Sequence, residues 1–238
     1  DFNGDTKDEY LVVSHGDNML NFSIPGINEL KIDSFVLKNF NEGPKSEINN
    51  SLKGNILVEA GDLDNNGKSE LILAYADTTG KVQINILGLN EEGEFTELSS
   101  LQDEVLSNTD ETEMFSIDIS DLDRNGRNEI LMIFFSNNPE PGIYLNIYDF
   151  SGPNHSVFNK TRQLIDNEYS VNHLVQEKIL SLDVTSVDLD GDGLKEIAPG
   201  FSTLAETCDL YIFPLEVEDD PQTPEENRFE KIDRKSDV

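Results

Sequence analysis

The chain has a single cysteine and lacks long apolar runs. Because Cys208 is alone among 238 residues, no disulfide can form within the chain. The apolar runs are short, as in Ile130 to Phe135, whereas a membrane-spanning helix needs about eighteen or more such residues. The sequence therefore predicts neither a disulfide-stabilised scaffold nor membrane insertion in this segment.

Basic residues are also scarce. The 17 lysines and arginines are outnumbered by 48 aspartates and glutamates, which gives a formal net charge of −31 at pH 7. Such a surface repels nucleic acid and anionic lipid, which are bound by clustered Lys and Arg. We therefore exclude both as partners. The excess of acid favours a solvated exterior, with capture of a cationic partner as the alternative.

Residues typical of enzyme and glycan-binding sites are few. There is no tryptophan, and His15, His155 and His173 are far apart and have no metal-ligand spacing. No nucleophile-elbow motif or phosphate-binding glycine loop is present. Tyr144, Tyr148 and Phe150 on one expected strand, or Phe158 and Tyr169 nearby, are candidates for stacking on a sugar, but packing in the core and rim is the preferred interpretation. We expect no catalytic residues and no activity of the chain's own.

Four acidic loops of nine residues dominate what remains. They are Asp1–Glu9, Asp62–Glu70, Asp121–Glu129 and Asp188–Glu196. Each carries oxygen-bearing side chains at loop positions 1, 3, 5 and 9, and calcium takes about six to eight oxygen ligands at about 2.3–2.6 Å. Position 6, where the chain turns sharply, is glycine in three loops and Thr6 in the first. The pattern predicts calcium sites, and the first loop is the weakest match.

The loops differ from EF-hand loops, which need a glutamate at position 12 and a helix on either side. Position 12 is apolar or proline in this chain, at Val12, Leu73, Met132 and Pro199. The flanking runs are rich in Val, Ile, Leu, Phe and Tyr and are bounded by Gly, Asn, Asp and Pro, which is typical of short strands. We therefore expect each loop to connect two strands.

The loops also mark a repeat. They begin at residues 1, 62, 121 and 188, at intervals of 61, 59 and 67 residues, which indicates an array of similar units. Each unit is expected to contain four strands, with the loop between the first and the second. First strands are predicted at 54–61, 113–120 and 179–187, and second strands at 9–15, 70–76, 129–135 and 196–202. Third strands are predicted at 18–24, 81–88, 142–149 and 208–214, and fourth strands at 32–39, 94–98, 155–160 and 228–233.

Burial is expected to fall across each unit. The second strands are nearly continuous in apolar residues, which suits strands buried on both faces, whereas the third and fourth alternate or turn polar. Apolar residues near helical spacing predict a short helix within 162–178 and a helical turn at 98–106. The alternative for both segments is a loop anchored by a few apolar residues.

The loop pattern, Asp-x-Asp/Asn-x-Asp/Asn-Gly-x-x-Glu followed by Leu or Ile, resembles the FG-GAP or VCBS repeat. That family forms calcium-binding β-propellers in integrin α-subunit heads and in many bacterial and archaeal surface proteins. The resemblance implies an all-β fold, with four-stranded blades arranged as a β-propeller. It further implies about four blades in this chain, as an arc of a propeller of about six to eight.

The resemblance covers the whole chain, 1–238, as one propeller region. It implies repeats at approximately 1–53, 54–112, 113–178 and 179–238, the first of which lacks its opening strand. Because the sequence begins inside a loop, we expect the intact protein to extend further and to supply the remainder of the propeller.

The same resemblance assigns metal ligands and implies up to four calcium ions, one per repeat. The side-chain ligands are Asp1, Asn3, Asp5 and Glu9; Asp62, Asp64, Asn66 and Glu70; Asp121, Asp123, Asn125 and Glu129; and Asp188, Asp190, Asp192 and Glu196. Position 7 contributes a backbone carbonyl, from Lys7, Lys68, Arg127 and Leu194.

We therefore expect a calcium-stabilised, non-enzymatic module of an extracellular or cell-surface protein that acts in adhesion, scaffolding, or protein or glycan binding. One alternative is a supporting propeller in a carbohydrate-active enzyme such as a polysaccharide lyase. A further alternative is an intracellular scaffold whose loops hold no ion.

Overall fold

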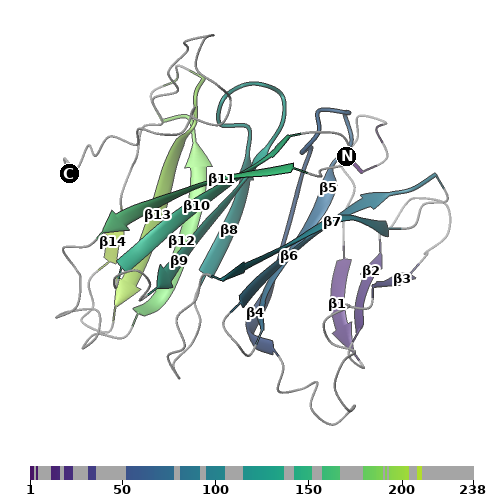
Figure 1. Cartoon of the computed structure of the whole chain (residues 1–238), viewed down its shortest axis with the longest axis horizontal. Helices are drawn as coiled ribbons and strands as arrows, with labels where there is room; N and C mark the ends of the chain where they lie inside the picture. Colours follow the sequence, from purple (N-terminus) through teal and green to yellow (C-terminus); the bar gives the residue numbers. More distant parts are fainter. Residues whose placement is uncertain are drawn as a thin grey trace. The chain divides into compact units, whose positions relative to one another are not determined.

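In the computed structural model, the described part of the chain forms β-strands and the turns between them (Figure 1). The structure describes residues 1–2, 4, 12–16, 19–23, 32–35, 52–77, 81–91, 95–104, 115–136, 142–151, 157–166, 179–189, 191, 193–203 and 208–210. Within these ranges there is no helix, and therefore none that could cross a membrane. The predicted all-β class is confirmed.

The described strands form four antiparallel sheets, in each of which consecutive strands are neighbours. The first sheet contains β1 (Val12–Gly16), β2 (Met19–Ser23) and β3 (Ile32–Phe35). The second contains β4 (Leu52–Gly61), β5 (Glu70–Asp77), β6 (Lys81–Leu89) and β7 (Phe95–Glu104). The third contains β8 (Phe115–Ser120), β9 (Glu129–Ser136), β10 (Gly142–Ser151) and β11 (Val157–Asp166). The fourth contains β12 (Ile179–Val187), β13 (Glu196–Thr203) and β14 (Cys208–Leu210).

The predicted strand order agrees with these sheets. Every predicted first, second and third strand overlaps an observed strand, and β12 has the predicted bounds. The predicted fourth strands overlap β3, β7 and β11. The last of them, 228–233, lies outside the described residues. Runs of β-branched and aromatic residues bounded by turn residues were therefore a sufficient guide to the strands.

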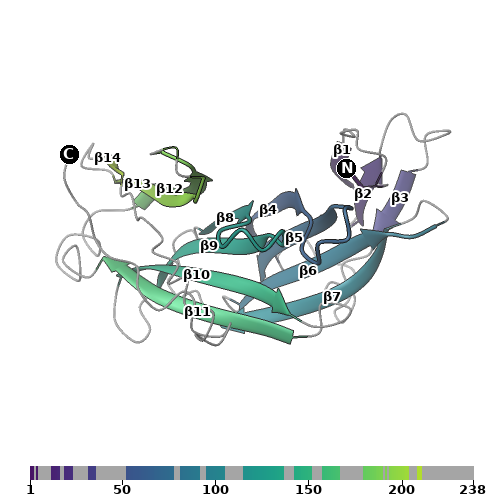
Figure 2. The same ribbon diagram turned by 90° about the horizontal axis from the view of Figure 1, so that it is seen from above.

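Both predicted helical segments, 98–106 and 162–178, are wrong where the structure describes them. Residues up to 104 belong to β7 and residues up to 166 belong to β11, and the rest lie outside the described residues. The apolar spacing was outweighed by strand pairing, because β7 pairs with β6 and β11 pairs with β10. Figure 2 shows β10 and β11 side by side.

The two inner strands of each four-stranded sheet are buried. In β5 and β9 this burial was predicted, and the apolar residues Leu71 to Ala76 and Ile130 to Phe134 are inaccessible or nearly so. The predicted fall in burial from the second strand to the third is wrong in these two sheets, because β6 and β10 are also buried along most of their length. Polar residues of these strands, such as Asn146, are buried along with the apolar ones.

The aromatic residues of the buried strand β10 pack within the fold rather than stand on its surface. Tyr144, Tyr148 and Phe150 are all buried, and Tyr144 stacks on Phe134 with ring centroids 5.7 Å apart. The Tyr148 hydroxyl accepts a hydrogen bond of 2.9 Å from Asn146 Nδ2. Packing within the fold is confirmed for these rings.

The chain divides into two compact units. The first contains Asp1–Asp62 and Asn66–Glu104, and the second contains Leu63–Asn65 and Val105–Val238. The core of the second unit is formed by aliphatic residues of the third and fourth sheets together with one loop residue. These residues are Leu122, Leu131, Ile133, Ile143, Leu145, Ile147, Leu182, Val184 and Ile197.

Two hydrogen bonds join the first strands of the third and fourth sheets. Ser116 Oγ on β8 donates to Asp183 Oδ1 on β12 at 2.7 Å, and Ser186 Oγ on β12 donates to Asp118 Oδ2 on β8 at 2.9 Å. Within the second unit, these polar pairs therefore join β8 to β12, which itself contributes Leu182 and Val184 to the apolar core.

Loop position 2 carries a large apolar residue in all four loops. Phe2, Leu63 and Leu122 are 4%, 0% and 0% exposed, whereas Leu189 is 52% exposed. Phe2 contacts the edge of Phe95 on β7, with ring centroids 5.6 Å apart, and Leu122 joins the core against β12 and β13. The position therefore anchors a loop to a sheet in three of the four repeats.

The anchoring role can be tested with a matched pair of substitutions at loop position 2. Leu122→Ala should lower the free energy of unfolding by about 2–5 kcal/mol, because it removes a fully buried side chain and leaves a cavity. Leu189→Ala should cost less than about 1 kcal/mol, because much of its side chain is already in water. Urea unfolding of both variants measures the difference, and equal losses would contradict the assignment of Leu122 to the core.

Candidate metal centre

The acidic loops lie between the first and second strands of three sheets. Strand pairing closes each loop at the same place, because Gly61 pairs with Glu70, Ser120 with Glu129 and Val187 with Glu196. Position 9 is thus both the last residue of the loop and the first residue of a strand. The register of the sheet fixes the loop length at nine residues and holds the position 9 glutamate at the base of the loop.

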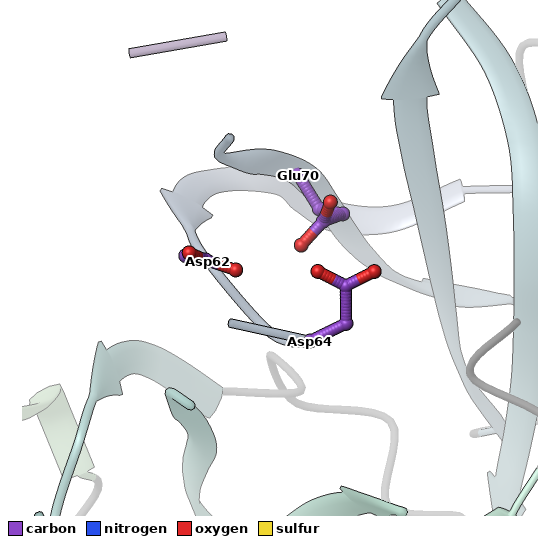
Figure 3. Close-up of side chains that lie close together, drawn as sticks. All are labelled: Asp62, Asp64 and Glu70. Carbon is purple, nitrogen blue, oxygen red and sulfur yellow. The ribbon is translucent and has the colours of Figure 1, made fainter. Parts of the chain in front are cut away.

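In the second loop, the carboxylates of Asp62, Asp64 and Glu70 face a common centre (Figure 3). One oxygen from each lies within 4.8 Å of the others. Asp62 accepts hydrogen bonds from the backbone N–H groups of Asn66 at 3.1 Å and Gly67 at 2.8 Å. These bonds hold Asp62 in place while one side of the carboxylate cluster is open to solvent at Asp64.

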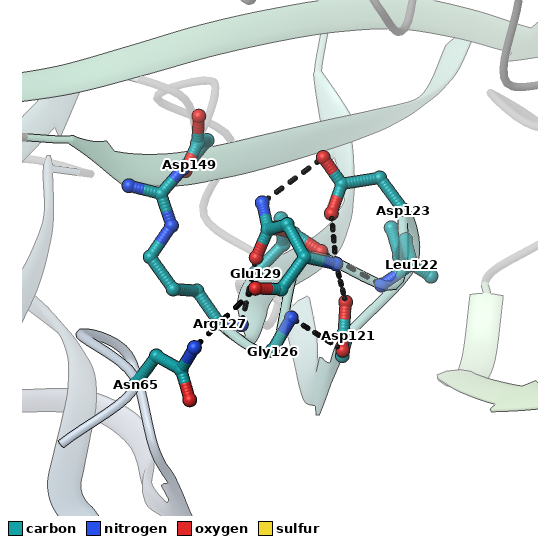
Figure 4. Close-up of polar contacts among 9 residues, drawn as sticks. Asn65, Asp121, Leu122, Asp123, Gly126, Arg127, Glu129 and Asp149 are labelled. Atoms are coloured by element: carbon teal, nitrogen blue, oxygen red, sulfur yellow. Dashed lines mark hydrogen bonds and ion pairs between the residues drawn. The ribbon is translucent and has the colours of Figure 1, made fainter. Parts of the chain in front are cut away.

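The third loop has the same arrangement (Figure 4). Oxygens of Asp121, Asp123 and Glu129 lie within 4.8 Å of one another. Asp121 accepts hydrogen bonds from the N–H groups of Asn125 at 3.1 Å and Gly126 at 3.0 Å. Two loops of different sequence therefore converge on one geometry, in which backbone donors orient the position 1 aspartate.

The position 5 asparagine is oriented by the same loop backbone. Asn66 Oδ1 accepts from the Lys68 N–H at 2.8 Å, and Asn125 Oδ1 accepts from the Arg127 N–H at 2.7 Å. Asn125 Nδ2 also donates to Asp123 Oδ2 at 3.0 Å, which links positions 5 and 3. The predicted side-chain ligands of both loops therefore lie within the same short turns.

Glu129 is the most deeply buried acid of the third loop, at 0% exposure. Its Oε2 accepts a 2.8 Å hydrogen bond from the Leu122 N–H, and its Oε1 accepts none from the described part of the chain. Burial, together with the nearby negative charges of Asp123, Asp149 and Asp121, raises the pKa of Glu129 to about 9, against the lowering effect of the Leu122 N–H. Without a cation beside it, this carboxyl group is held in its neutral form at pH 7.

Two loop positions have an unusual backbone wherever the structure describes them. Position 6 has φ of +83°, +84° and +88° at Gly67, Gly126 and Gly193, as the glycine pattern predicted. Position 4 is also left-handed, with φ of 60° at Asn65 and 59° at Arg124. Gly4 and Gly191 have φ of 78° and 79° at the same position in the first and last loops. Sequence analysis missed position 4, although glycine in two loops and asparagine in a third were a usable signal.

The first and last loops are described in part. Asp1 Oδ1 accepts from the Gly4 N–H at 2.7 Å, and Asp188 Oδ1 accepts from the Gly191 N–H at 2.7 Å. Glu196 Oε2 accepts from the Leu189 N–H at 2.7 Å, as its counterpart Glu129 does in the third loop. The other predicted side-chain ligands of these two loops lie outside the described residues. They are Asn3, Asp5 and Glu9, and Asp190 and Asp192.

The predicted carbonyl ligands at position 7 are described in three loops, at Lys68, Arg127 and Leu194, whereas Lys7 lies outside the described residues. The side chain of Arg127 extends toward Asp149 on β10, with Nη2 3.9 Å from Oδ1. Asp149 was not singled out from the sequence. The signal was an acid in the apolar third strand, between Tyr148 and Phe150, and its charge acts on Glu129.

The donor set of the second and third loops fits a hard divalent cation. Each brings together three carboxylates, one of them nearly or fully buried, with an amide oxygen nearby in the turn. Oxygen ligands of this kind suit calcium and magnesium, and calcium tolerates the more irregular geometry. The buried Glu129 Oε1, which receives no hydrogen bond within the described residues, marks where a cation would interact most strongly.

The backbone requirement at position 6 gives a prediction. Gly67→Ala should lower the free energy of unfolding by about 1–2 kcal/mol through backbone strain alone, because an added Cβ would meet nothing within 4 Å. Gly67→Asn should lose less, because asparagine adopts the left-handed conformation more readily. Urea unfolding in excess chelator compares the two without an ion contribution, and a Gly67→Ala variant as stable as the parent would refute the requirement.

Comparison of the chain with protein-family models and with curated proteins found no match. The assignment of the acidic loops as a metal centre therefore rests on their own geometry: three converging carboxylates, backbone donors that orient them, and a buried glutamate at the base.

Proposed function

We propose that the chain is a calcium-stabilised β-propeller module in which each acidic loop binds one ion between the first and second strands of a blade. The observation that carries the proposal is the carboxylate cluster of Asp121, Asp123 and Glu129, with Glu129 buried. The second loop repeats this cluster with Asp62, Asp64 and Glu70.

Electrostatics favour a bound cation over an acidic turn that holds no ion. Three carboxylates within 4.8 Å repel one another when ionised, and the strand register of the sheet prevents them from separating at position 9. A divalent cation removes the repulsion and offsets the desolvation of Glu129. In this proposal the ion joins residues of one loop to the start of the next strand, so its binding energy stabilises the sheet.

The propeller arrangement is supported by the order of the sheets. Four antiparallel meanders follow one another along the chain, and the loops that connect their first two strands recur about every sixty residues. A propeller is built from such meanders, one per blade. We propose that the four sheets are successive blades, of which the second and third are complete within the described residues.

We further propose a non-enzymatic role in adhesion, scaffolding, or protein or glycan binding at an extracellular or cell-surface site. Extracellular calcium modules work with dissociation constants of about 10⁻⁴–10⁻³ M, a range accessible to short loops with three or four charged ligands. The acidic ligands are engaged with their own loop backbone, which supports a structural use of the ion. The binding partner would then contact other loops or strand edges of the module.

The proposal predicts that calcium stabilises the folded chain. At one hundred times its dissociation constant, an ion bound to the native state alone contributes about 2.7 kcal/mol. Thermal unfolding in excess chelator should therefore begin at a lower temperature than in calcium. Glu129→Gln should reduce the calcium-dependent increase, because it removes the buried charged ligand while preserving shape.

The exposed Glu91 provides a matched control, since Glu91→Gln removes one carboxylate outside the acidic loops and should leave the calcium response unchanged. Metal analysis of the chelated sample establishes that the ion has been removed. If calcium did not change the melting temperature of the parent chain, the proposed function would be rejected.

The raised pKa of Glu129 predicts that calcium binding depends on pH. Calcium binds the ionised carboxylate, whereas the ion-free loop holds a proton up to about pH 9. The affinity of the third loop should therefore increase with pH, by up to about tenfold per unit below pH 9, and binding should release a proton. Calorimetry in buffers of different ionisation enthalpy measures that proton, which should be missing in Glu129→Gln.

Without calcium, the same shift acts on stability in the opposite sense. The folded-state pKa of about 9 lies above the ordinary value of 4.5, so the favourable contribution of protonated Glu129 is complete below pH 4.5 and is lost as pH rises toward 9. In chelator, Glu129→Gln should lose less stability than the parent chain between these values. Parallel pH profiles for the two proteins would show that Glu129 does not titrate in this range.

A further inference from the structure

We propose that Arg124 is a positioning residue that couples calcium binding at the third loop to calcium binding at the fourth, so that the two loops fill cooperatively. This inference rests on the proposed function, because it assumes that both loops bind calcium. Both loops belong to the second compact unit. The coupling concerns a residue that is not itself a predicted ligand.

Arg124 reaches directly from one loop to the next. Its Nε donates a 2.9 Å hydrogen bond to the carbonyl oxygen of Gly193, at position 6 of the fourth loop. Gly193 immediately precedes Leu194, whose carbonyl is the predicted position 7 ligand. A hydrogen bond at this carbonyl restrains the turn from which the next carbonyl must point toward an ion.

The guanidinium group also occupies the space beside Gly193. A Cβ added to Gly193 would collide with Arg124 Nη2, in a residue whose φ is +88°. The fourth loop therefore depends on glycine at position 6 for two reasons: its own backbone conformation and the room needed by the side chain from the third loop. The third and fourth loops are therefore in close contact where the Arg124 side chain lies beside Gly193.

The third loop in turn fixes Arg124. This residue stands at position 4, between the predicted ligands Asp123 and Asn125, and its φ of 59° is unfavourable for arginine. An ion held by positions 3 and 5 would keep position 4 in this conformation and so keep the side chain aimed at Gly193. Occupancy of one loop and order in the next are then linked through a single residue.

A second instance of the contact occurs in the same compact unit. Asn65, at position 4 of the second loop, donates from Nδ2 to the carbonyl oxygen of Asn125 at 3.4 Å. Asn65 lies beside this turn in Figure 4, and a Cβ added to Gly126 would lie 2.6 Å from Asn65 Nδ2. A position 4 side chain therefore lies over the position 6 glycine of the following loop in both cases. The first and last loops carry Gly4 and Gly191 at position 4 and have no side chain with which to make this contact.

The natural glycines define the test substitution. Arg124→Gly should preserve the left-handed backbone, as Gly191 does, and remove the side chain that reaches the fourth loop. Calcium titrations followed by amide NMR would report each loop separately, through Gly126 for the third and Gly193 for the fourth. The calcium midpoint of the fourth loop should rise about threefold to tenfold, the effect of losing one charge-assisted hydrogen bond in an exposed position.

Electrostatics alone predicts the opposite sign, which makes the test sharp. Removing a positive charge beside an acidic loop should strengthen calcium binding there. Lys195→Gln, at position 8 of the fourth loop, removes a charge without altering the Arg124 contact and serves as the control. Arg124→Lys keeps a donor and a charge and should recover part of the lost affinity.

A double-mutant cycle separates coupling from a local defect. Glu129→Gln disables the third loop and should also raise the midpoint of the fourth, and adding Arg124→Gly should then have little further effect. If the fourth loop kept its midpoint or bound more tightly in Arg124→Gly, while both loops still bound calcium, the coupling would be refuted. If neither loop of the parent chain bound calcium, the proposed function and the coupling would fail together.

Discussion

The structure depends on the confinement of several carboxylates in one strand-to-strand turn. Pairing of Ser120 with Glu129 fixes the base of the third loop, and backbone N–H groups hold Asp121 at its opening. Glu129 cannot move away from the two aspartates without breaking the register of the sheet. The packing of apolar strands thus offsets the repulsion among the acids, because β9, which contributes Leu131 and Ile133 to the core, also begins with Glu129.

Much of the fold and of the loop geometry follows from local chemistry in the sequence. Alternating apolar residues and β-branched residues between turn residues located the strands. Strand formation depends mainly on side chains that pack on one face of a sheet and on a neighbouring strand to pair with. The spacing of Asp62, Asp64 and Glu70 predicted convergence, because a turn of nine residues closed by a strand pair leaves few places for those side chains. In the same way, the glycine at position 6 predicted the left-handed backbone conformation that the structure has there.

Other features depend on neighbours that are distant in sequence. Leu98 and Leu101 fall near helical spacing, but β7 is held as a strand by its partner β6, which no local pattern contains. Burial of Glu129 and the approach of Asp149 from β10 arise from tertiary packing. The left-handed backbone of Arg124 is compensated by a contact 69 residues away, so its own side chain gave no indication of it.

The exposure of Leu189 links the solubility of the fourth loop to its predicted calcium site. Val187 and Leu189 are 38% and 52% exposed, and Asp188 stands between them in the chain. A charge placed beside exposed apolar residues keeps them hydrated and discourages aggregation. Here that charge belongs to Asp188, a predicted calcium ligand. The same carboxylate is therefore expected to help bind the ion and to keep the neighbouring apolar side chains hydrated.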